Sequence, residues 1–252
     1  MNGGIESVAM AVIETKDIVM EFGQTRALDG VSLTVEKGDI FGFFGPNGAG
    51  KTTLIRILTG QLEPTSGSVE VMGVNAVEEP IRLKNLVGIV PEVESPPTYL
   101  TAYEYLYFVG RIRKLDRLDD RIEHWLSFFD LEGKKGTICK DMSKGMRQKL
   151  MIASAFIHGP ELVFLDEPFI NLDPIYQRLL RQYLEEYLAS GGTVFMCSHI
   201  LEISERLCNK IAIVNMGRIV RQGLKSELIR DGEGLEEVFL DAIGGDLQRR
   251  PS

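Results

Sequence analysis

The sequence predicts an α/β fold with a mainly parallel core sheet, a small antiparallel β subdomain and a helical insert. The apolar run 40–44 leads directly into a glycine-rich stretch and then into a helical pattern. Short apolar strands alternate with helical stretches between residues 162 and 214, which is typical of a parallel sheet. The pattern at about 95–160 is helical. We therefore expect residues 1–252 to form one domain, with a helical subdomain at about 95–160 and a C-terminal tail at about 223–252.

The first third of the chain carries short strand patterns. Residues 31–35 alternate apolar and polar side chains at period two, and residues 19–22 and 40–44 are also strand-like. These segments predict an antiparallel start that leads into the core sheet. Further strands are expected at residues 68–72 and 86–90.

Capping residues mark the helix starts. Thr101 and Glu104 form the pattern of a capping box, and Ser143 is a suitable N-cap for a helix over 144–157. A helix between these two buries one apolar face, made of Ile122, Trp125, Leu126 and Phe129. The later elements expected are a strand at 162–165, a helix at 174–189, and strands at 193–197 and 211–214.

Residues 45–53 fit the pattern G-x-x-x-x-G-K-[ST] between a strand and a helix, which is the context that a phosphate-binding loop requires. Glycines let backbone N–H groups turn inward around an anion, and the following helix aims the positive end of its dipole at it. Lys51 adds charge for the β- and γ-phosphates, and the Thr52 hydroxyl can hold Mg²⁺. A structural glycine turn is the alternative, but it explains neither the Lys nor the Thr. The sequence therefore predicts a P-loop NTPase that binds ATP or GTP. The expected nucleotide contacts are Gly45, Pro46, Asn47, Gly48, Ala49, Gly50, Lys51, Thr52 and Thr53.

Polar residues follow two later strands. Asp166 and Glu167 come directly after the apolar strand 162–165, which is how nucleotide enzymes place a Mg²⁺-binding carboxylate and a second acid near the γ-phosphate. His199 lies just past the end of the strand 193–197. Ligands of parallel sheets bind outside the carboxyl ends of the strands, so this histidine is placed for function.

The charge, cysteine spacing and hydropathy of the chain argue against several classes of protein. The chain has 28 Lys and Arg against 36 Asp and Glu, a net charge of −8, which argues against a bulk nucleic-acid binder. Cys139, Cys197 and Cys208 lack C-x-x-C spacing, so we expect buried thiols in a reducing cytosol. Since no apolar stretch reaches about 18 residues and no signal pattern occurs, we expect a chain that neither spans a membrane nor carries a signal.

With these elements in order, the chain resembles the ATP-binding subunit of an ABC transporter from about residue 13 to 240. The resemblance implies ATP and Mg²⁺ as ligands and the fold already described. It also implies roles for five residues outside the phosphate loop. They are Phe22 as the base-stacking aromatic, Asp166 as the magnesium aspartate, Glu167 as the catalytic glutamate, Asp173 as the D-loop acid and His199 as the switch histidine.

Residues 142–148 stand where that family has its signature, usually L-S-G-G-Q. Ser143 and Gly145 match it, which implies that they contact nucleotide, while Lys144 and Met146 depart from it. The form S-K-G-M-R-Q is similar to the variant of drug and antibiotic exporter subunits, which implies export. The serine at a helix N-terminus can also present N–H donors to a γ-phosphate.

Two other departures concern loops. Glu92 stands where the family usually has Gln after Val-Pro, and a carboxylate there would join Thr52 and Asp166 around Mg²⁺. A solvated loop acid is the alternative interpretation. Ile170 and Asn171 replace the small residues that commonly begin the D-loop. The sequence therefore does not decide whether the D-loop makes the contact that it makes in the family.

The resemblance also implies partners. It implies a head-to-tail dimer, homo- or heteromeric, in which each ATP lies between one subunit's phosphate loop and the other subunit's signature. It further implies separate membrane-spanning permease subunits, and a cytoplasmic chain held peripherally on the inner face of the cell membrane through them. The alternative is a soluble ABC-type ATPase acting on ribosomes or DNA. The substrate is not predicted, because the missing membrane subunit forms the translocation path.

Five aromatic residues within ten positions exceed what one helix face can bury. We expect about half of them in the core and the rest on a surface for a membrane partner. They are Tyr99, Tyr103, Tyr105, Tyr107 and Phe108.

Overall fold

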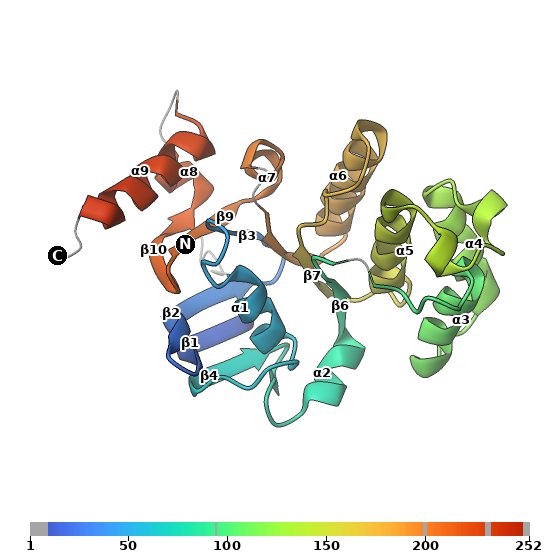
Figure 1. The fold of residues 1–252 in the computed structure, drawn as a ribbon, viewed down its shortest axis with the longest axis horizontal. Helices are drawn as coiled ribbons and strands as arrows, with labels where there is room; N and C mark the ends of the chain where they lie inside the picture. The colour runs from blue at the N-terminus through green and yellow to red at the C-terminus, as the bar shows by residue number, and fades with distance from the viewer. Residues whose placement is uncertain (1–9, 94, 199–200, 230–232, 249–252) are drawn as a thin grey trace, which may run out of the picture.

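A computed structural model describes residues 10–93, 95–198, 201–229 and 233–248, and its strands form two sheets (Figure 1). The smaller sheet is antiparallel, in the order β2-β1-β4-β5. Its strands are β1 (Ala11–Phe22), β2 (Thr25–Glu36), β4 (Ser66–Val71) and β5 (Val74–Asn75). β1 and β2 are each longer than the patterns at 19–22 and 31–35, since both strands pair along 12 residues.

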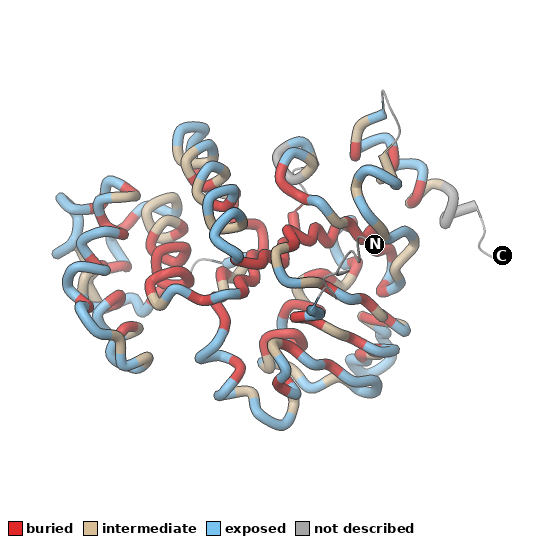
Figure 2. The backbone as a smooth tube through the Cα atoms, turned by 180° about the vertical axis from the view of Figure 1, so that it is seen from behind, coloured by how far each residue is buried: buried red, intermediate tan, exposed pale blue. Residues whose placement is uncertain are grey.

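The larger sheet has the order β10-β9-β3-β8-β7-β6, and all its described pairs are parallel except the hairpin of β9 and β10. Its strands are β3 (Ile40–Phe44), β6 (Val87–Val90), β7 (Leu162–Asp166), β8 (Thr193–Cys197), β9 (Lys210–Asn215) and β10 (Arg218–Leu224). Every residue of β3, β7 and β8 is buried, as expected for apolar strands covered on both faces. Figure 2 shows these central strands as a buried band through the molecule. The expected α/β architecture is confirmed.

Helices cover this sheet and extend beyond it. They are α1 (Lys51–Leu58), α2 (Pro80–Leu86), α3 (Ala102–Ile112), α4 (Leu118–Phe128), α5 (Lys144–Phe156), α6 (Pro174–Ala189), α7 (Leu201–Leu207), α8 (Lys225–Leu228) and α9 (Leu235–Gln248), with 3₁₀ turns η1 (Glu132–Lys134) and η2 (Cys139–Asp141). α3, α4 and α5 gather on the side of the molecule away from β10 and α9 (Figure 1). None of the helices, within the ranges described, is long and apolar enough to cross a membrane.

The helix caps form as expected. Thr101 Oγ1 accepts from the N–H of Glu104 at 3.1 Å, and the Glu104 carboxylate accepts from the N–H of Thr101 at 2.8 Å, which completes the capping box. The apolar face of α4 is buried, with Trp125 stacked on Phe129 and Phe156 and edge-on to Tyr183. These rings join α4, α5 and α6 into one hydrophobic cluster.

Several segments differ from, or go beyond, the sequence-based expectations. The strand expected at 86–90 begins one residue later, because Leu86 ends helix α2. Pro80 at the first position of α2 supplies a fixed backbone angle, but only Leu83 of this helix is buried, so its apolar pattern is weak. Helices α7 to α9 and strand β10 lie where no element was expected.

Candidate functional site

The carboxyl ends of four neighbouring parallel strands meet at one edge of the larger sheet. The glycine-rich loop follows β3, Ser198 follows β8, Asp166 ends β7, and Glu92 lies two residues after β6. Residues more than 40 positions apart in the chain thereby come together, as expected for a ligand site of a parallel sheet.

The glycine-rich loop has no room for larger residues at two positions. A Cβ on Gly45 would lie 2.4 Å from the carbonyl oxygen of Val214 in β9. A Cβ on Gly50 would lie 2.6 Å from the carbonyl oxygen of Ala27, and Gly50 also has φ of +104°. Gly50 is the N-cap of α1 and offers no side-chain cap, so the first N–H groups of α1 remain for an anion.

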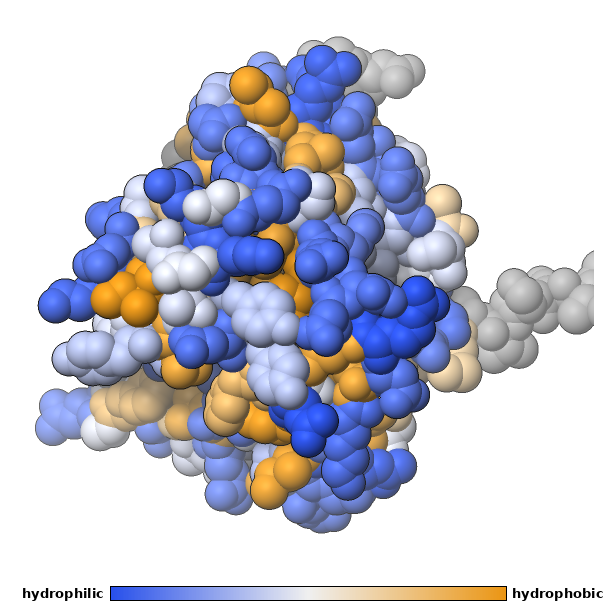
Figure 3. All heavy atoms as spheres, turned by 90° about the vertical axis from the view of Figure 1, so that its right-hand side faces the viewer, coloured by the Kyte–Doolittle hydropathy of each residue, from blue (hydrophilic) through white to orange (hydrophobic). Residues whose placement is uncertain are grey.

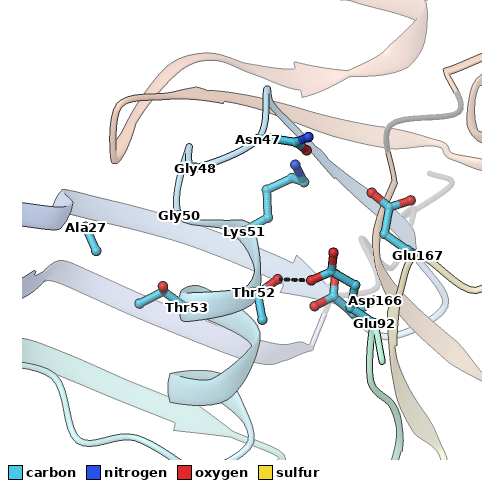
Figure 4. Close-up of a pocket in the computed structure, with 10 residues that line it drawn as sticks. All are labelled: Ala27, Asn47, Gly48, Gly50, Lys51, Thr52, Thr53, Glu92, Asp166 and Glu167. Atoms are coloured by element: carbon cyan, nitrogen blue, oxygen red, sulfur yellow. Dashed lines mark hydrogen bonds between the residues drawn. The ribbon is translucent and has the colours of Figure 1, made fainter. Parts of the chain in front are cut away.

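The Lys51 side chain is buried and folds back over the loop. Its Nζ donates to the carbonyl oxygens of Gly45 at 2.7 Å and Pro46 at 3.2 Å. Figure 4 shows the ammonium group near Asn47, facing the same space as Glu167 and Asp166. A positive charge is thus fixed at the mouth of the loop, where a phosphate oxygen can replace a carbonyl acceptor.

A pocket of about 270 Å³ opens beside the loop (Figure 4). It is lined by Ala27, Asn47, Gly48, Gly50, Lys51, Thr52, Thr53, Glu92, Asp166 and Glu167. Except for Ala27, every lining residue was expected from the sequence. Ala27 was missed because a small residue in a strand gives no signal, and it reaches the pocket only because β2 packs on Gly50.

Asp166 is a buried carboxylate without a hydrogen-bond partner on either oxygen among the residues that the structure describes. Burial raises the pKa of Asp166 to about 6, the charges of Glu92 and Glu167 add to this rise, and Thr52 and Lys51 oppose it. The nearby Thr52 Oγ1 donates instead to Glu92 Oε2 at 3.3 Å (Figure 4). An unsatisfied buried carboxylate, a second carboxylate and a hydroxyl form the all-oxygen donor set that suits Mg²⁺.

Glu167 continues from Asp166 with an unusual backbone. Its φ is +53°, and its N–H donates to the carbonyl oxygen of Cys197 in β8 at 2.9 Å. The turn brings the Glu167 carboxylate to the pocket from β7. A second pocket of about 350 Å³ also includes Glu92, Glu167 and Ser198.

Other residues expected at the site lie away from this pocket. Ser143 is the exposed N-cap of α5, where its Oγ accepts from the N–H of Met146 at 3.2 Å. Gly145 lies in the first turn of the same helix. Asp173 caps α6 by accepting from the N–H groups of Ile175 and Tyr176 at 3.0 and 3.3 Å. In the part of the chain that the structure describes, these residues line neither of the two pockets beside the phosphate loop.

The structure leaves two expectations untested. Phe22 ends β1 with 51% of its surface exposed and does not line the pocket, so its stacking on a base stays a prediction. His199 lies outside the described residues. The expected burial of all three cysteines is confirmed.

The parallel sheet, the glycine-rich loop at the start of α1 and the acids after β6 and β7 together define a P-loop nucleotide-binding domain. Residues 28–170 match the family described as "ABC transporter". The chain belongs to the ABC transporter family. It is an ATP-binding subunit of such a transporter and an ATPase that powers substrate movement.

Curated relatives are similar in sequence to almost the whole chain. The chain is 34% identical over 244 residues to the Nod factor export ATP-binding protein I of Cupriavidus pinatubonensis, covering 94% of this chain and 75% of that protein. It is 33% identical over 243 residues to the protein of the same name from Rhizobium meliloti, covering 95% and 72%.

Solved structures share the fold. The ATP-binding subunit of an ABC transporter matches with a TM-score of 0.87 at 29% identity, over 92% of this chain and 99% of that one. An ATP-binding cassette of an ABC transporter in its ADP conformation matches with a TM-score of 0.72 at 27% identity, over 95% and 97%.

Proposed function

We propose that the chain binds Mg·ATP in the pocket beside the glycine-rich loop and hydrolyses it within a dimer to drive export through separate membrane-spanning subunits. The observation that carries this proposal is the convergence of Lys51, Thr52, Glu92, Asp166 and Glu167 on one pocket. On one side of the pocket, Lys51 offers positive charge for phosphate oxygens. On the other side, the carboxylates of Glu92, Asp166 and Glu167 lie close together and would be stabilised by a cation.

Each residue has a role in this proposal. Residues 45–53 hold the phosphates through backbone N–H groups, and Lys51 exchanges a carbonyl acceptor for phosphate oxygens. Thr52, Asp166 and Glu92 would hold Mg²⁺, which would neutralise negative charge on the phosphates. Glu167 orients or deprotonates the attacking water. His199 would hold the γ-phosphate.

Glu92 is tested by the variant Glu92→Gln, which keeps the shape of the side chain and removes one negative charge. We expect the Mg²⁺ concentration that gives half-maximal ATP hydrolysis to rise several-fold, because a neutral amide is a weaker ligand of a hard cation. The measurement is a Mg²⁺ titration of ATPase activity at fixed ATP. If the Mg²⁺ titrations of wild type and variant superimpose, Glu92 is not a metal ligand but a solvated loop acid. The proposed ligands would then be Thr52 and Asp166 alone.

The position of α5 supports the second chain in this proposal. Ser143 and Lys144 are exposed at the start of α5 and do not line the pocket of their own chain. A helix N-terminus presents N–H donors and a positive dipole end to an anion. A head-to-tail dimer would therefore close each ATP between one chain's loop and the other chain's α5.

The membrane partner would dock on the apolar surface of α3 and the loop before it. Of the five clustered aromatics, Tyr105 is buried and Tyr103 is partly buried, while Tyr99, Tyr107 and Phe108 expose 81%, 41% and 52% of their surfaces. The side chains of Val93, in the segment before α3, and Ile112, at the end of α3, are also exposed. Figure 3 shows apolar side chains among polar ones on the side of the molecule where α3 and α4 lie. An exposed apolar surface of this kind suits a helix of a membrane subunit.

This docking surface is tested with Phe108→Glu. A charge in an apolar interface should release the chain from the membrane fraction of its source cells, while ATP hydrolysis by the purified variant stays within about twofold of wild type. Leu240→Glu, at a side chain of α9 that is 61% exposed, is the matched control and should stay with the membrane. Wild-type protein that sediments with ribosomes or DNA instead would favour the alternative class of soluble ABC-type ATPase.

Export as the direction of transport is supported by the signature variant at 142–148 and by the relatives, whose names describe export of Nod factor. The chain would work on the inner face of the cell membrane, held there by its partner subunits.

A further inference from the structure

The segment that follows Asp166 is held by two glutamine side chains from different helices. We call residues 167–171 the acidic loop. Gln148 of α5 donates from Nε2 to the carbonyl oxygen of Pro168 at 3.2 Å. Gln177 of α6 donates from Nε2 to the next carbonyl oxygen, that of Phe169, at 3.1 Å. Two consecutive carbonyl groups of the acidic loop therefore depend on side-chain amides.

Gln148 is nearly inaccessible, with 1% of its surface exposed. A primary amide is costly to bury unless it is hydrogen-bonded, so its presence in the core calls for a specific role. An apolar residue of similar length would fill the same space without that cost. The hydrogen bond to Pro168 is the contact that distinguishes glutamine from such a residue.

The acidic loop needs this support because its backbone is strained at Glu167. Glu167 has φ of +53°, a left-handed conformation that a glutamate rarely adopts, whereas Asn171, with φ of +63°, is of a residue type that tolerates it. Strained conformations persist only where surrounding contacts over-determine them. The N–H of Glu167 is tied to Cys197 in β8 on one side, and Gln148 and Gln177 tie the next two residues on the other.

The signature segment also contacts the far end of the acidic loop. A Cβ on Gly145 would lie 2.7 Å from the carbonyl oxygen of Asn171, so only glycine fits there without a shift. Gly145 and Gln148 are three residues apart and therefore share one face of α5. The first turns of α5 thus touch the acidic loop at Asn171 and at Pro168.

We propose that Gln148 and Gln177 are positioning residues that fix the direction of the Glu167 carboxylate by holding the acidic loop. Gln148 would also link Ser143 to the acidic loop, because Ser143 caps the start of α5, the helix that carries Gln148. A shift of α5 when Ser143 meets the nucleotide of another chain would move Pro168, and with it Glu167 at the chain's own nucleotide. This inference rests on the proposed roles of Glu167 and Ser143.

The test uses Gln148→Met and Gln177→Met in the full-length chain, with Mg·ATP as substrate. Methionine keeps the length and approximate volume of glutamine but cannot donate. We expect kcat to fall roughly tenfold or more in Gln148→Met while the KM for ATP stays within about twofold, since a misplaced catalytic group lowers turnover without weakening binding. Gln222→Met, at an exposed glutamine of β10, is the matched control and should hydrolyse ATP like wild type.

A double-mutant cycle separates positioning from a general structural effect. In single-turnover hydrolysis, adding Gln148→Met to Glu167→Gln should cause no further loss, because the glutamine acts through the residue already removed. If Gln148→Met lowers the single-turnover rate of the Glu167→Gln protein by the same factor as it lowers that of wild type, the inference is overturned. A kcat within twofold of wild type in both methionine variants, or a change confined to KM, would also overturn it.

Two safeguards keep the outcomes distinct. Should Gln148→Met fail to fold, the half-buried Gln177 carries the same cycle with Glu167→Gln by itself. Failure of the proposed function would appear without any glutamine substitution, as wild type that does not hydrolyse ATP or as Glu167→Gln that hydrolyses it normally.

Discussion

Glu167→Gln should lower kcat for ATP hydrolysis by roughly two to four orders of magnitude while ATP affinity stays near that of wild type. The amide keeps the length and packing of the side chain, so the pocket and its phosphate contacts persist. It cannot accept a proton from water, which removes the proposed function of Glu167 at the end of β7. Steady-state hydrolysis and equilibrium ATP binding measure the two quantities.

Glu161→Gln provides the matched control for that substitution. Glu161 precedes the same strand, β7, and pairs with Lys37 on the surface at 2.8 Å. Removing an exposed ion pair costs about 1 kcal/mol or less, so its turnover should match wild type. Near-normal hydrolysis by Glu167→Gln would show that another group activates the water.

ATP with Mg²⁺ should convert the Glu167→Gln protein from monomer to dimer, and ADP should not. Only ATP supplies a γ-phosphate that can reach Lys51 of one chain and the start of α5 in the other, in the proposed arrangement. The slow variant retains that phosphate long enough for the mass to be measured by light scattering. An isologous pair, with the same patches on each side, is the expected product.

Adding Ser143→Arg to the slow variant should abolish this dimer, because a long charged side chain would replace the exposed cap of α5 at the interface. Ser190→Arg is the control, since Ser190 likewise bonds at a helix end, donating to the Tyr187 carbonyl oxygen at 2.8 Å. Loss of the N-cap at Ser143 and loss of the single hydrogen bond of Ser190 should each cost about 1 kcal/mol, so a difference between the variants reports the interface. An unchanged monomer with ATP and Mg²⁺ in the parent variant would contradict the proposed dimer.

The parts of the molecule that the sequence predicts well are those with local causes. Residues 45–53 need only a strand, a glycine-rich turn and a helix in succession, and helix α6 is marked by Asp173 and Pro174 at its start. Asp166 could be placed because it ends a wholly apolar strand. The bounds of α6 and β8 agree with expectation for this reason.

Features with distant causes could not be predicted. Ala27 enters the pocket through a contact with Gly50, 23 positions away, and Gln148 finds Pro168 across 20 positions. Nothing in the neighbouring residues distinguishes these positions from an ordinary strand alanine or helix glutamine. Helix α9 was likewise missed, although Leu235 and Val238 are buried, because its packing against α7 and β9 is a tertiary effect.

The unsatisfied carboxylate of Asp166 links catalysis to the lifetime of the folded chain. Since its pKa in the fold is raised to about 6 from an ordinary 3.8, the stability it contributes is present below pH 4 and is lost as the pH rises through 6. At neutral pH the nucleotide-free fold therefore holds an ionised group that destabilises it. A ligand bound only by the native state offsets this by about 2.7 kcal/mol at a hundred times its dissociation constant. Bound as proposed, Mg·ATP would therefore stabilise the native fold as well as supply energy, and its concentration would affect how long an idle subunit resists unfolding and proteolysis.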